Sequence, residues 1–199
     1  MKESNNQEKS IRIFVLPIII ISLLTAIDQF TKYIILVSFQ LYESKPVIKD
    51  VFSITYIQNK GMAWGMFQGK IPIFLILTAI ILILCFRILY NVSTNKRYAP
   101  AKYVVILLIS GAIGNLIDRV KLGYVVDFFN FELINFPVFN VADIYVVVSM
   151  IAAIILLMFV YNDKETDDIL RLSFKKKLDE NNSDDIELVS EEEYVEEDK

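Results

Sequence analysis

Charged residues that could carry out acid–base chemistry stand beside or inside strongly apolar sequence in this chain. The segment GNLIDRVKLGYVVDFFN, residues 114–130, follows an apolar run yet contains Asp118, Arg119 and Asp127. Another carboxylate, Asp143, interrupts the last apolar run of the chain. A charge at the middle of a membrane costs about 3 kcal/mol or more. Charges kept at such positions therefore indicate a structural or chemical role.

The residue inventory narrows the chemistry that these positions could support. The chain has no histidine and a single cysteine, Cys85, which lies within an apolar run and is interpreted as a packing residue. Ser-His and Cys-His nucleophilic pairs and histidine-ligated zinc are therefore excluded. Acid–base chemistry near neutral pH must use carboxylates, lysine, tyrosine or that cysteine.

Two converging carboxylates would supply a hydrolytic site without metal or histidine. Such a pair cannot ionise twice at low cost, so one pKa rises and the pair shares a proton. The ionised member can take a proton from water, and the protonated member can donate to a carbonyl oxygen. Asp127 and Asp143 flank one short loop and are expected at the same depth, which makes them the candidates.

Four long apolar runs must position these side chains. The chain is 55% hydrophobic, with a mean hydropathy of +0.48, which is unusual for a soluble domain. A membrane span needs roughly 20 residues, and four runs can supply it. They are centred on residues 13–37, 71–90, 103–117 and 138–160. We therefore predict an all-α membrane protein with four transmembrane helices.

The domain organisation follows from these runs. Residues 1–12 are a short N-terminal lead, 13–161 form the four-helix domain, and 162–199 form an acidic tail. The tail has too little apolar residue to pack and is expected to be disordered, apart from a possible short helix at 171–177. The basic start resembles a signal peptide, but no small-residue cleavage site follows, so we interpret the first run as an uncleaved helix.

Lysine and arginine placement predicts the orientation. Twelve are expected on one side: Lys2, Lys9, Arg12, Arg87, Lys96, Arg97, Lys102, Lys164, Arg171, Lys175, Lys176 and Lys177. Seven are expected on the other: Lys32, Lys45, Lys49, Lys60, Lys70, Arg119 and Lys121. Because cytoplasmic segments carry the excess of basic residues, both termini are expected in the cytoplasm.

Asp28 and Lys32 are expected in the outer third of the first span. At 1.5 Å per residue, Asp28 lies about 22 Å into a hydrocarbon core of roughly 30 Å. Lys32 follows at i+4, in the favourable order for an acid–base pair. Structural pairing and substrate positioning are both open as roles for these two residues.

The third run ends in a polar face at a similar depth. Asn115, Asp118 and Arg119 are spaced i, i+3 and i+4, so they share one side of a helix. Asp118 is expected to pair locally with Arg119 or Lys121. A snorkelling helix end is the alternative to a role in the site.

The outer loops contain one expected strand. The first outer loop covers about 38–70, where VFSITYIQN alternates with an imperfect two-residue period that predicts a surface strand. The following NKG at 59–61 predicts a turn. The second outer loop, about 124–138, is short and aromatic, as expected at the headgroup level.

Four sequence blocks resemble the signature of the lipoprotein signal peptidase (signal peptidase II) family. They are DQFTK at 28–32, NKGMAWGMF at 59–67, GAIGNLIDRVKLGYVVDFF at 111–129 and FNVADIYVVVS at 139–149. The order and spacing are similar to the family's, over about residues 12–161. Met62 and Trp64 stand where alanine and phenylalanine are common in the family, and Trp64 keeps an aromatic ring there.

The resemblance implies a site and a reaction. It makes Asp127 and Asp143 the catalytic pair. It also implies that a further set of residues lines or supports the site: Asp28, Lys32, Asn59, Gly61, Trp64, Asn115, Arg119, Asn140 and Ala142. The implied activity is that of a bacterial inner-membrane aspartic endopeptidase that removes the signal peptide from prolipoproteins, cutting before a cysteine that carries diacylglycerol.

The resemblance also implies partners and location. The expected partners are diacylglyceryl prolipoproteins and membrane lipid, with no metal, cofactor or nucleic acid, and a monomeric state. The active site is expected near the outer face of a multi-pass protein in the bacterial cytoplasmic membrane. The alternative is a small proton-coupled transporter, which would also use intramembrane acids. A third interpretation is a non-enzymatic assembly or scaffold subunit. Against a transporter, the acids cluster at one face and no inverted repeat is visible.

Overall fold

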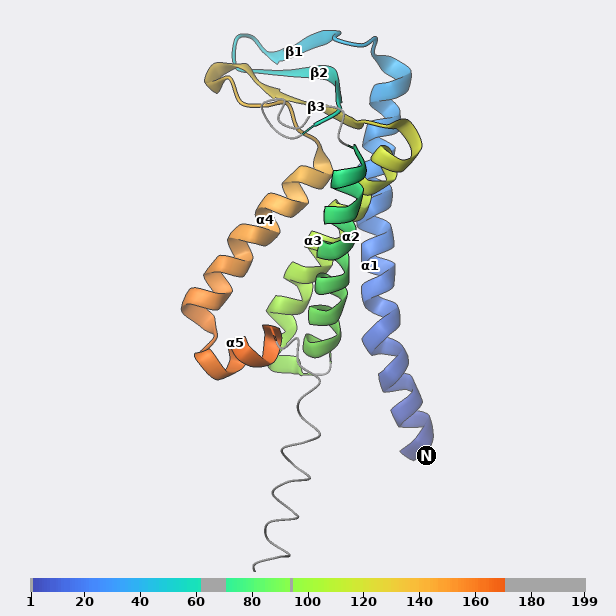
Figure 1. Cartoon of the computed structure of the whole chain (residues 1–199), viewed down its shortest axis with the longest axis vertical. Helices are drawn as coiled ribbons and strands as arrows, with labels where there is room; N and C mark the ends of the chain where they lie inside the picture. Colours follow the sequence, from blue (N-terminus) through green and yellow to red (C-terminus); the bar gives the residue numbers. More distant parts are fainter. Residues whose placement is uncertain (1, 62–70, 94, 171–199) are drawn as a thin grey trace, which may run out of the picture. The chain divides into compact units, whose positions relative to one another are not determined.

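The computed structural model describes residues 2–61, 71–93 and 95–170, with side chains from Val15 onward. Four helices among them are long and apolar enough to cross a membrane, which confirms the four-helix prediction (Figure 1). They are α1 (Lys2–Ser38), α2 (Ile71–Val92), α3 (Ala99–Leu122) and α4 (Val141–Ile155), which continues as one π-helical turn, Leu156–Val160. Short 3₁₀ turns occupy Lys96–Tyr98 and Glu132–Ile134.

Helix α3 is central to the packing, since it contacts each of the other three long helices. Two glycines allow the close approach. A Cβ atom on Gly111 would lie 2.5 Å from the carbonyl oxygen of Ala142 on α4. A Cβ atom on Gly114 would lie 2.5 Å from a carboxylate oxygen of Asp28 on α1. Small residues therefore bring the polar segments of three helices together, as in other membrane helix packings.

The buried face of α1 changes character along its length. Its buried side chains recur every three or four residues, as expected for one helix face. They are Pro17, Ile21, Thr25, Asp28, Lys32 and Ile35. The first half of this stripe is mostly apolar, whereas Asp28 and Lys32 place charges inside the protein near the end of the helix at Ser38. Both charges lie inside the protein: Lys32 contacts α3, and Asp28 contacts α4 through the backbone N–H of Ala142.

A three-stranded antiparallel sheet, ordered β1-β2-β3, contacts the ends of α1 and α3. The strands are β1 (Ser44–Ile48), β2 (Phe52–Asn59) and β3 (Val125–Phe131). Strand β2 covers the predicted strand except its first residue, and the chain bends directly after it, near the predicted turn. Strands β1 and β3 were not predicted. Strand β3 occupies the first part of the second outer loop. In the register of β2 and β3, Ile57 lies opposite Asp127.

A further helix, α5 (Asp163–Leu170), occupies the start of the segment that was expected to be disordered. It is held by specific contacts. Arg97 Nε donates to Glu165 at 2.7 Å, and Asn91 Nδ2 donates to the carbonyl of Ile169 at 3.1 Å. The side chain of Ile169 is buried with the core residues of α2 and α3. The rest of the tail, including the helix expected at 171–177, lies outside the described residues.

Candidate active site

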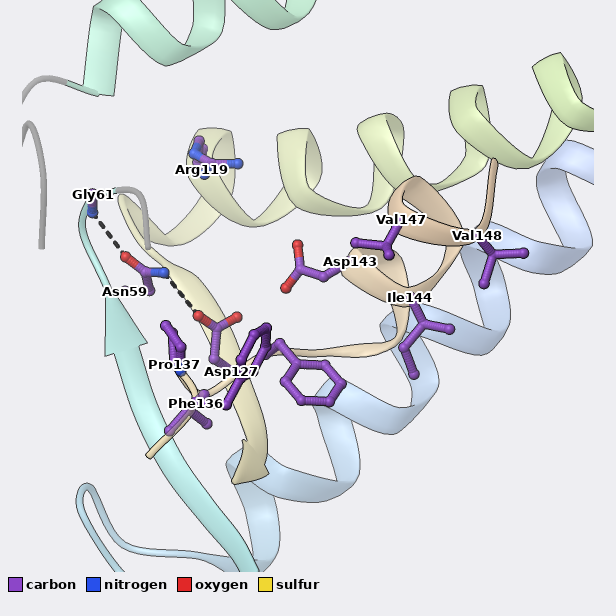
Figure 2. A pocket seen from close by; sticks show the side chains of 12 residues that line it. Asn59, Gly61, Arg119, Asp127, Phe136, Pro137, Asp143, Ile144, Val147 and Val148 are labelled. Atoms are coloured by element: carbon purple, nitrogen blue, oxygen red, sulfur yellow. Dashed lines mark hydrogen bonds between the residues drawn. The ribbon is translucent and has the colours of Figure 1, made fainter. Parts of the chain in front are cut away.

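Asp127 and Asp143 line one cavity of about 510 Å³ (Figure 2). Asn59, Gly61 and Arg119 complete its polar part. The remaining wall is apolar and was not predicted from the sequence. It comprises Phe136, Pro137, Val138, Phe139, Ile144, Val147 and Val148. A cavity with a few polar groups against an apolar wall is the usual form of a small-molecule or peptide site.

Asp127 belongs to strand β3, not to a loop just beyond α3, and only 2% of its surface is exposed. Its Oδ2 atom accepts from Asn59 Nδ2 at 2.9 Å, and its Oδ1 atom accepts from Asn140 Nδ2 at 2.6 Å. Burial, together with the nearby Asp143 carboxylate, raises the pKa of Asp127 to about 7, against the lowering effect of the two amide donors. A carboxyl group with this pKa can hold a proton near neutral pH.

Asp143 lies in the first turn of α4, where it forms a capping box with Asn140. The backbone N–H of Asp143 donates to Asn140 Oδ1 at 3.0 Å, and the backbone N–H of Asn140 donates to Asp143 Oδ2 at 3.1 Å. Asn115 Nδ2 donates to the other carboxylate oxygen at 2.8 Å. The local sequence that starts the helix therefore also orients the second carboxylate.

Asn115 and Asn140 are two of the three asparagines that hold the carboxylates, and their amide orientations are determined by other donors. Lys32 can only donate, so its Nζ contact of 2.9 Å identifies Asn115 Oδ1 as an acceptor and turns the Asn115 NH₂ group toward Asp143. The Asp143 backbone N–H similarly fixes Asn140 Oδ1, which turns that NH₂ group toward Asp127. Neither amide can flip without losing a buried hydrogen bond.

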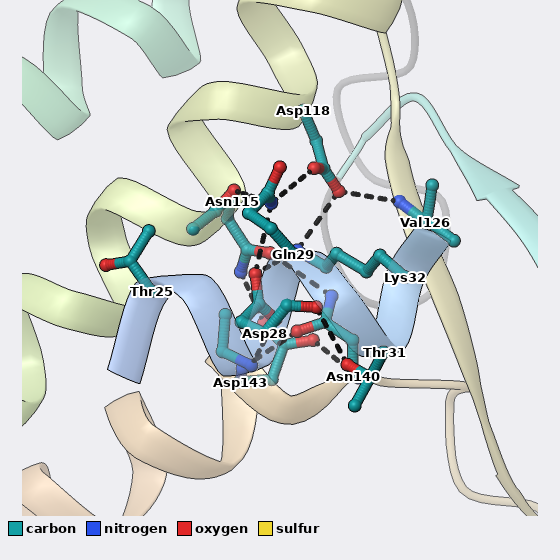
Figure 3. A network of polar contacts seen from close by, with 12 residues as sticks. Thr25, Asp28, Gln29, Thr31, Lys32, Asn115, Asp118, Val126, Asn140 and Asp143 are labelled. Atoms are coloured by element: carbon teal, nitrogen blue, oxygen red, sulfur yellow. Dashed lines mark hydrogen bonds and ion pairs between the residues drawn. The ribbon is translucent and has the colours of Figure 1, made fainter. Parts of the chain in front are cut away.

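Behind the cavity lies a buried charge network centred on Lys32 (Figure 3). Lys32 Nζ lies 3.0 Å from carboxylate oxygens of both Asp28 and Asp118. The predicted pairing of Asp28 with Lys32 is confirmed. The predicted local pairing of Asp118 is wrong, because its side chain turns toward Lys32 on α1 and also accepts from the backbone N–H of Val126 at 3.1 Å. Asp118 thereby joins α3 to the strand that carries Asp127.

Asp28 also supports α4 directly. Its Oδ1 atom accepts from the backbone N–H of Ala142 at 2.9 Å, which satisfies a free donor in the first turn of that helix. Ala142 is fully buried beside Gly111 and Gly114, so a larger side chain would not fit there. Gln29, which sequence reasoning missed, bridges Asp28, Asp118 and the carbonyl of Gly114. The position of Gln29 directly after Asp28 was the feature of the sequence that could have indicated its role.

The candidate residues therefore divide into two groups. Asn59, Gly61 and Arg119 line the cavity with the carboxylates, whereas the others support it from behind: Asp28, Lys32, Asn115, Asn140 and Ala142. Trp64 lies outside the described residues. Arg119 donates to the carbonyl of Asn115 and lies 5.2 Å from the ring centroid of Phe74 on α2. Asp28 and Lys32 do not reach the cavity lining, which favours structural pairing as their role.

Comparison with known proteins identifies the family of the chain. The family profile described as Signal peptidase (SPase) II matches residues 20–159. The chain belongs to the signal peptidase II family. This peptidase is therefore a multi-pass bacterial membrane enzyme, as the sequence resemblance implied. Helix α5 begins beyond the matched residues.

Similar proteins cover most of the chain. A lipoprotein signal peptidase of Caldanaerobacter subterraneus is 42% identical over 143 residues, which is 71% of this chain and 95% of that protein. A second, of Clostridioides difficile, is 41% identical over 142 residues, with 71% and 94% covered. A solved bacterial membrane enzyme is 36% identical, with a TM-score of 0.65, and the match covers 72% of this chain and 88% of that one.

The described residues offer little to a metal ion. Among them, no group of three or more carboxylate or thiol side chains is placed to hold one. The polar atoms around the cavity are already engaged with one another, and none of their buried side-chain nitrogens or oxygens lacks a hydrogen-bond partner in the described part of the chain. What the arrangement offers chemically is a pair of carboxyl groups in one cavity.

Proposed function

We propose that this peptidase is an aspartic endopeptidase that cleaves the signal peptide from diacylglyceryl-modified prolipoproteins, before the lipid-modified cysteine. The observation that carries the proposal is the pair Asp127 and Asp143, brought from β3 and α4 to one cavity. Both are held by amide donors and one has its pKa raised to about 7. Such a pair can activate water and protonate a peptide group.

The cavity wall suits an apolar substrate segment. Ile144, Val147 and Val148 on α4 are between 39% and 53% exposed, and they continue from Asp143 along the helix. In a membrane these side chains face hydrocarbon, where a signal peptide and the acyl chains of a lipidated cysteine would lie. The acyl chains would hold the scissile bond at the height of the carboxylates, which restricts the reactants to a favourable geometry.

The proposal includes the orientation of the chain. With both termini in the cytoplasm, the sheet and the cavity lie at the outer face of the cytoplasmic membrane. We propose that the peptidase works there as a monomer, without a cofactor and without nucleic acid. Chelators should leave its activity unchanged, since the mechanism uses carboxyl groups alone.

The test is cleavage of a diacylglyceryl prolipoprotein by purified variants. Asp127→Asn and Asp143→Asn keep the shape of the side chains but remove the carboxyl group that can take up or give a proton, so each should lower the rate by about 10³-fold or more. The double variant should be little worse than either single variant, because the two residues act as a unit. Thermal melting in detergent should show that each variant folds.

Asp50→Asn is the matched control. Asp50 is exposed in the turn between β1 and β2 and has φ of 60°, a conformation that asparagine also adopts readily. The Asp50→Asn variant should cleave the prolipoprotein at the wild-type rate. A folded Asp143→Asn variant with near-normal cleavage would refute the pair, and a wild-type chain that leaves the prolipoprotein uncut would favour a transporter or scaffold.

A further inference from the structure

The two carboxylates of the cavity sit in unequal surroundings. Asp143 lies in the first turn of α4, where the helix N-terminus favours negative charge. One of its oxygens accepts from the backbone N–H of Asn140, a donor that cannot turn away. Its other oxygen accepts from Asn115 at 2.8 Å. Both the helix and the backbone therefore stabilise the ionised form of Asp143.

The Asn115 donor is strengthened from behind. Lys32 donates to Asn115 Oδ1 at 2.9 Å, on the far side of the amide from Asp143. A hydrogen bond to one end of an amide polarises it and strengthens donation from the other end. Part of the effect of the buried ammonium group thus reaches Asp143 through a neutral side chain.

Asp127 has none of these features. It lies on a strand, whose net dipole is small, and only 2% of it is exposed. Both of its donors are side-chain amides, from Asn59 and Asn140. The pKa of Asp127 is raised to about 7, chiefly by burial.

The other charged groups around the pair do not reverse this inequality. From α1 these are Asp28 and Lys32, which pair with each other at 3.0 Å. From α3 they are Asp118, which pairs with Lys32 at 3.0 Å, and Arg119, which lines the cavity beside both carboxylates. The positive charge of Arg119 acts on Asp143 first and on Asp127 second, so it does not favour a charge on Asp127 over one on Asp143.

We propose that the dyad holds its single proton on Asp127 and its negative charge on Asp143. Asp143 is then the general base toward water, and Asp127 is the general acid toward the peptide carbonyl. Asn115 is a positioning residue for the base, and Asn59 is a positioning residue for the acid. This inference rests on the proposed function and assigns the roles within its site.

The roles give a balanced reaction. Asp143 takes a proton from water as the water oxygen bonds to the carbonyl carbon, and Asp127 gives its proton to the carbonyl oxygen. The tetrahedral diol then collapses: Asp143 returns its proton to the leaving nitrogen, the C–N bond breaks, and Asp127 regains a proton from a diol hydroxyl. The products are a carboxylic acid and an amine, and the dyad returns to its starting state.

The assignment predicts which limb of the pH–rate profile responds to each asparagine. The acid limb reports protonation of the base, and the alkaline limb reports loss of the proton from the acid. Removing the Asn115 donor destabilises the Asp143 anion, so Asn115→Ala should move the acid limb upward by about 1 to 2 pH units. Asn59→Ala should move the alkaline limb upward by a similar amount, for the same reason at Asp127.

The experiment measures kcat/KM against pH for wild type, Asn59→Ala and Asn115→Ala, with a diacylglyceryl prolipoprotein as substrate. One limb should move in each variant while the other limb stays in place. A general loss of structure would lower the whole profile and would not move a single limb. Asn115→Ser is the second variant if Asn115→Ala fails to fold, and the Asn59 profile alone still tests the assignment.

The opposite results would overturn the assignment of the proton to Asp127. If Asn115→Ala moved the alkaline limb and Asn59→Ala moved the acid limb, the proton would rest on Asp143. Limbs that move together in each variant, or not at all, would also refute distinct roles. A failure of the proposed function is distinguishable, because Asp127→Asn and Asp143→Asn would then retain cleavage whatever the profiles show.

Discussion

Replacing Lys32 by methionine should destabilise the protein strongly, although Lys32 does not line the cavity. Methionine keeps the length and most of the volume of the side chain but removes the ammonium group. That group has three partners within 3.0 Å: Asp28, Asp118 and Asn115. The exposed fractions of the Lys32, Asp28 and Asp118 side chains are 2%, 0% and 4%, so water cannot solvate the carboxylates that the substitution leaves unpaired.

The expected cost follows from what Lys32→Met leaves behind. Two buried carboxylates lose their counter-charge, and removal of one member of a buried ion pair typically costs about 3–5 kcal/mol. Lys45→Met is the matched control, because Lys45 pairs with Glu43 at 3.2 Å but its side chain is 57% exposed. Exposed pairs contribute little, so the control should melt close to wild type.

Thermal melting in detergent measures both variants, and a double variant tests the cause. Adding Asp118→Asn to Lys32→Met removes one of the unpaired charges, so the double variant should be more stable than Lys32→Met alone. Costs that simply add would show that Lys32 and Asp118 are not coupled. A Lys32→Met variant that melts with wild type would refute the description of the network as a buried ion cluster.

Three further predictions concern packing, the α5 helix and topology. Gly114→Ala would place a methyl group 2.5 Å from an oxygen of Asp28, so it should cost about 1–3 kcal/mol and lower the melting temperature. Truncation after Asn162 removes α5 and should lower the melting temperature, whereas truncation after Leu170 should leave it unchanged; equal melting of both would show that α5 contributes nothing. Reporter fusions at the C-terminus should read cytoplasmic and fusions beside Lys45 external, and an external C-terminus would contradict the orientation.

The four spans could be predicted because a membrane helix must be long and apolar, which hydropathy measures directly. The ends of the helices could not be predicted in this way. Helix α1 reaches back to Lys2 and α3 covers Ala99–Leu122, since polar residues continue both helices beyond their apolar parts. Hydropathy measures only the part of a helix that suits lipid.

The strands show a similar limit. Strand β2 was predicted from its alternation, but β1 is exposed at all five residues and so carries no alternating pattern. Strand β3, VVDFFNF, is buried on both faces in its first half, so it reads as an apolar run. Its pairing with β2 is a long-range property that no short window contains.

Within the site, local spacing was sufficient for some contacts and misleading for others. The i+4 spacing identified the Asp28–Lys32 pair, since both residues lie on one helix. Asp118 was assigned to bases close to it in sequence, whereas its partner Lys32 lies on a different helix. The fold decides such contacts by bringing α1 and α3 together at Gly114.

Asn140 starts α4, orients Asp143 and donates to Asp127, all with one fully buried side chain. Substitution there would remove a helix cap and a contact in the site at the same time. An inhibitor that binds the two carboxylates in the arrangement that Asn140 imposes would therefore depend on residues that cannot be substituted without loss of the site. Resistance would have to arise instead on the apolar wall, at exposed positions such as Val147.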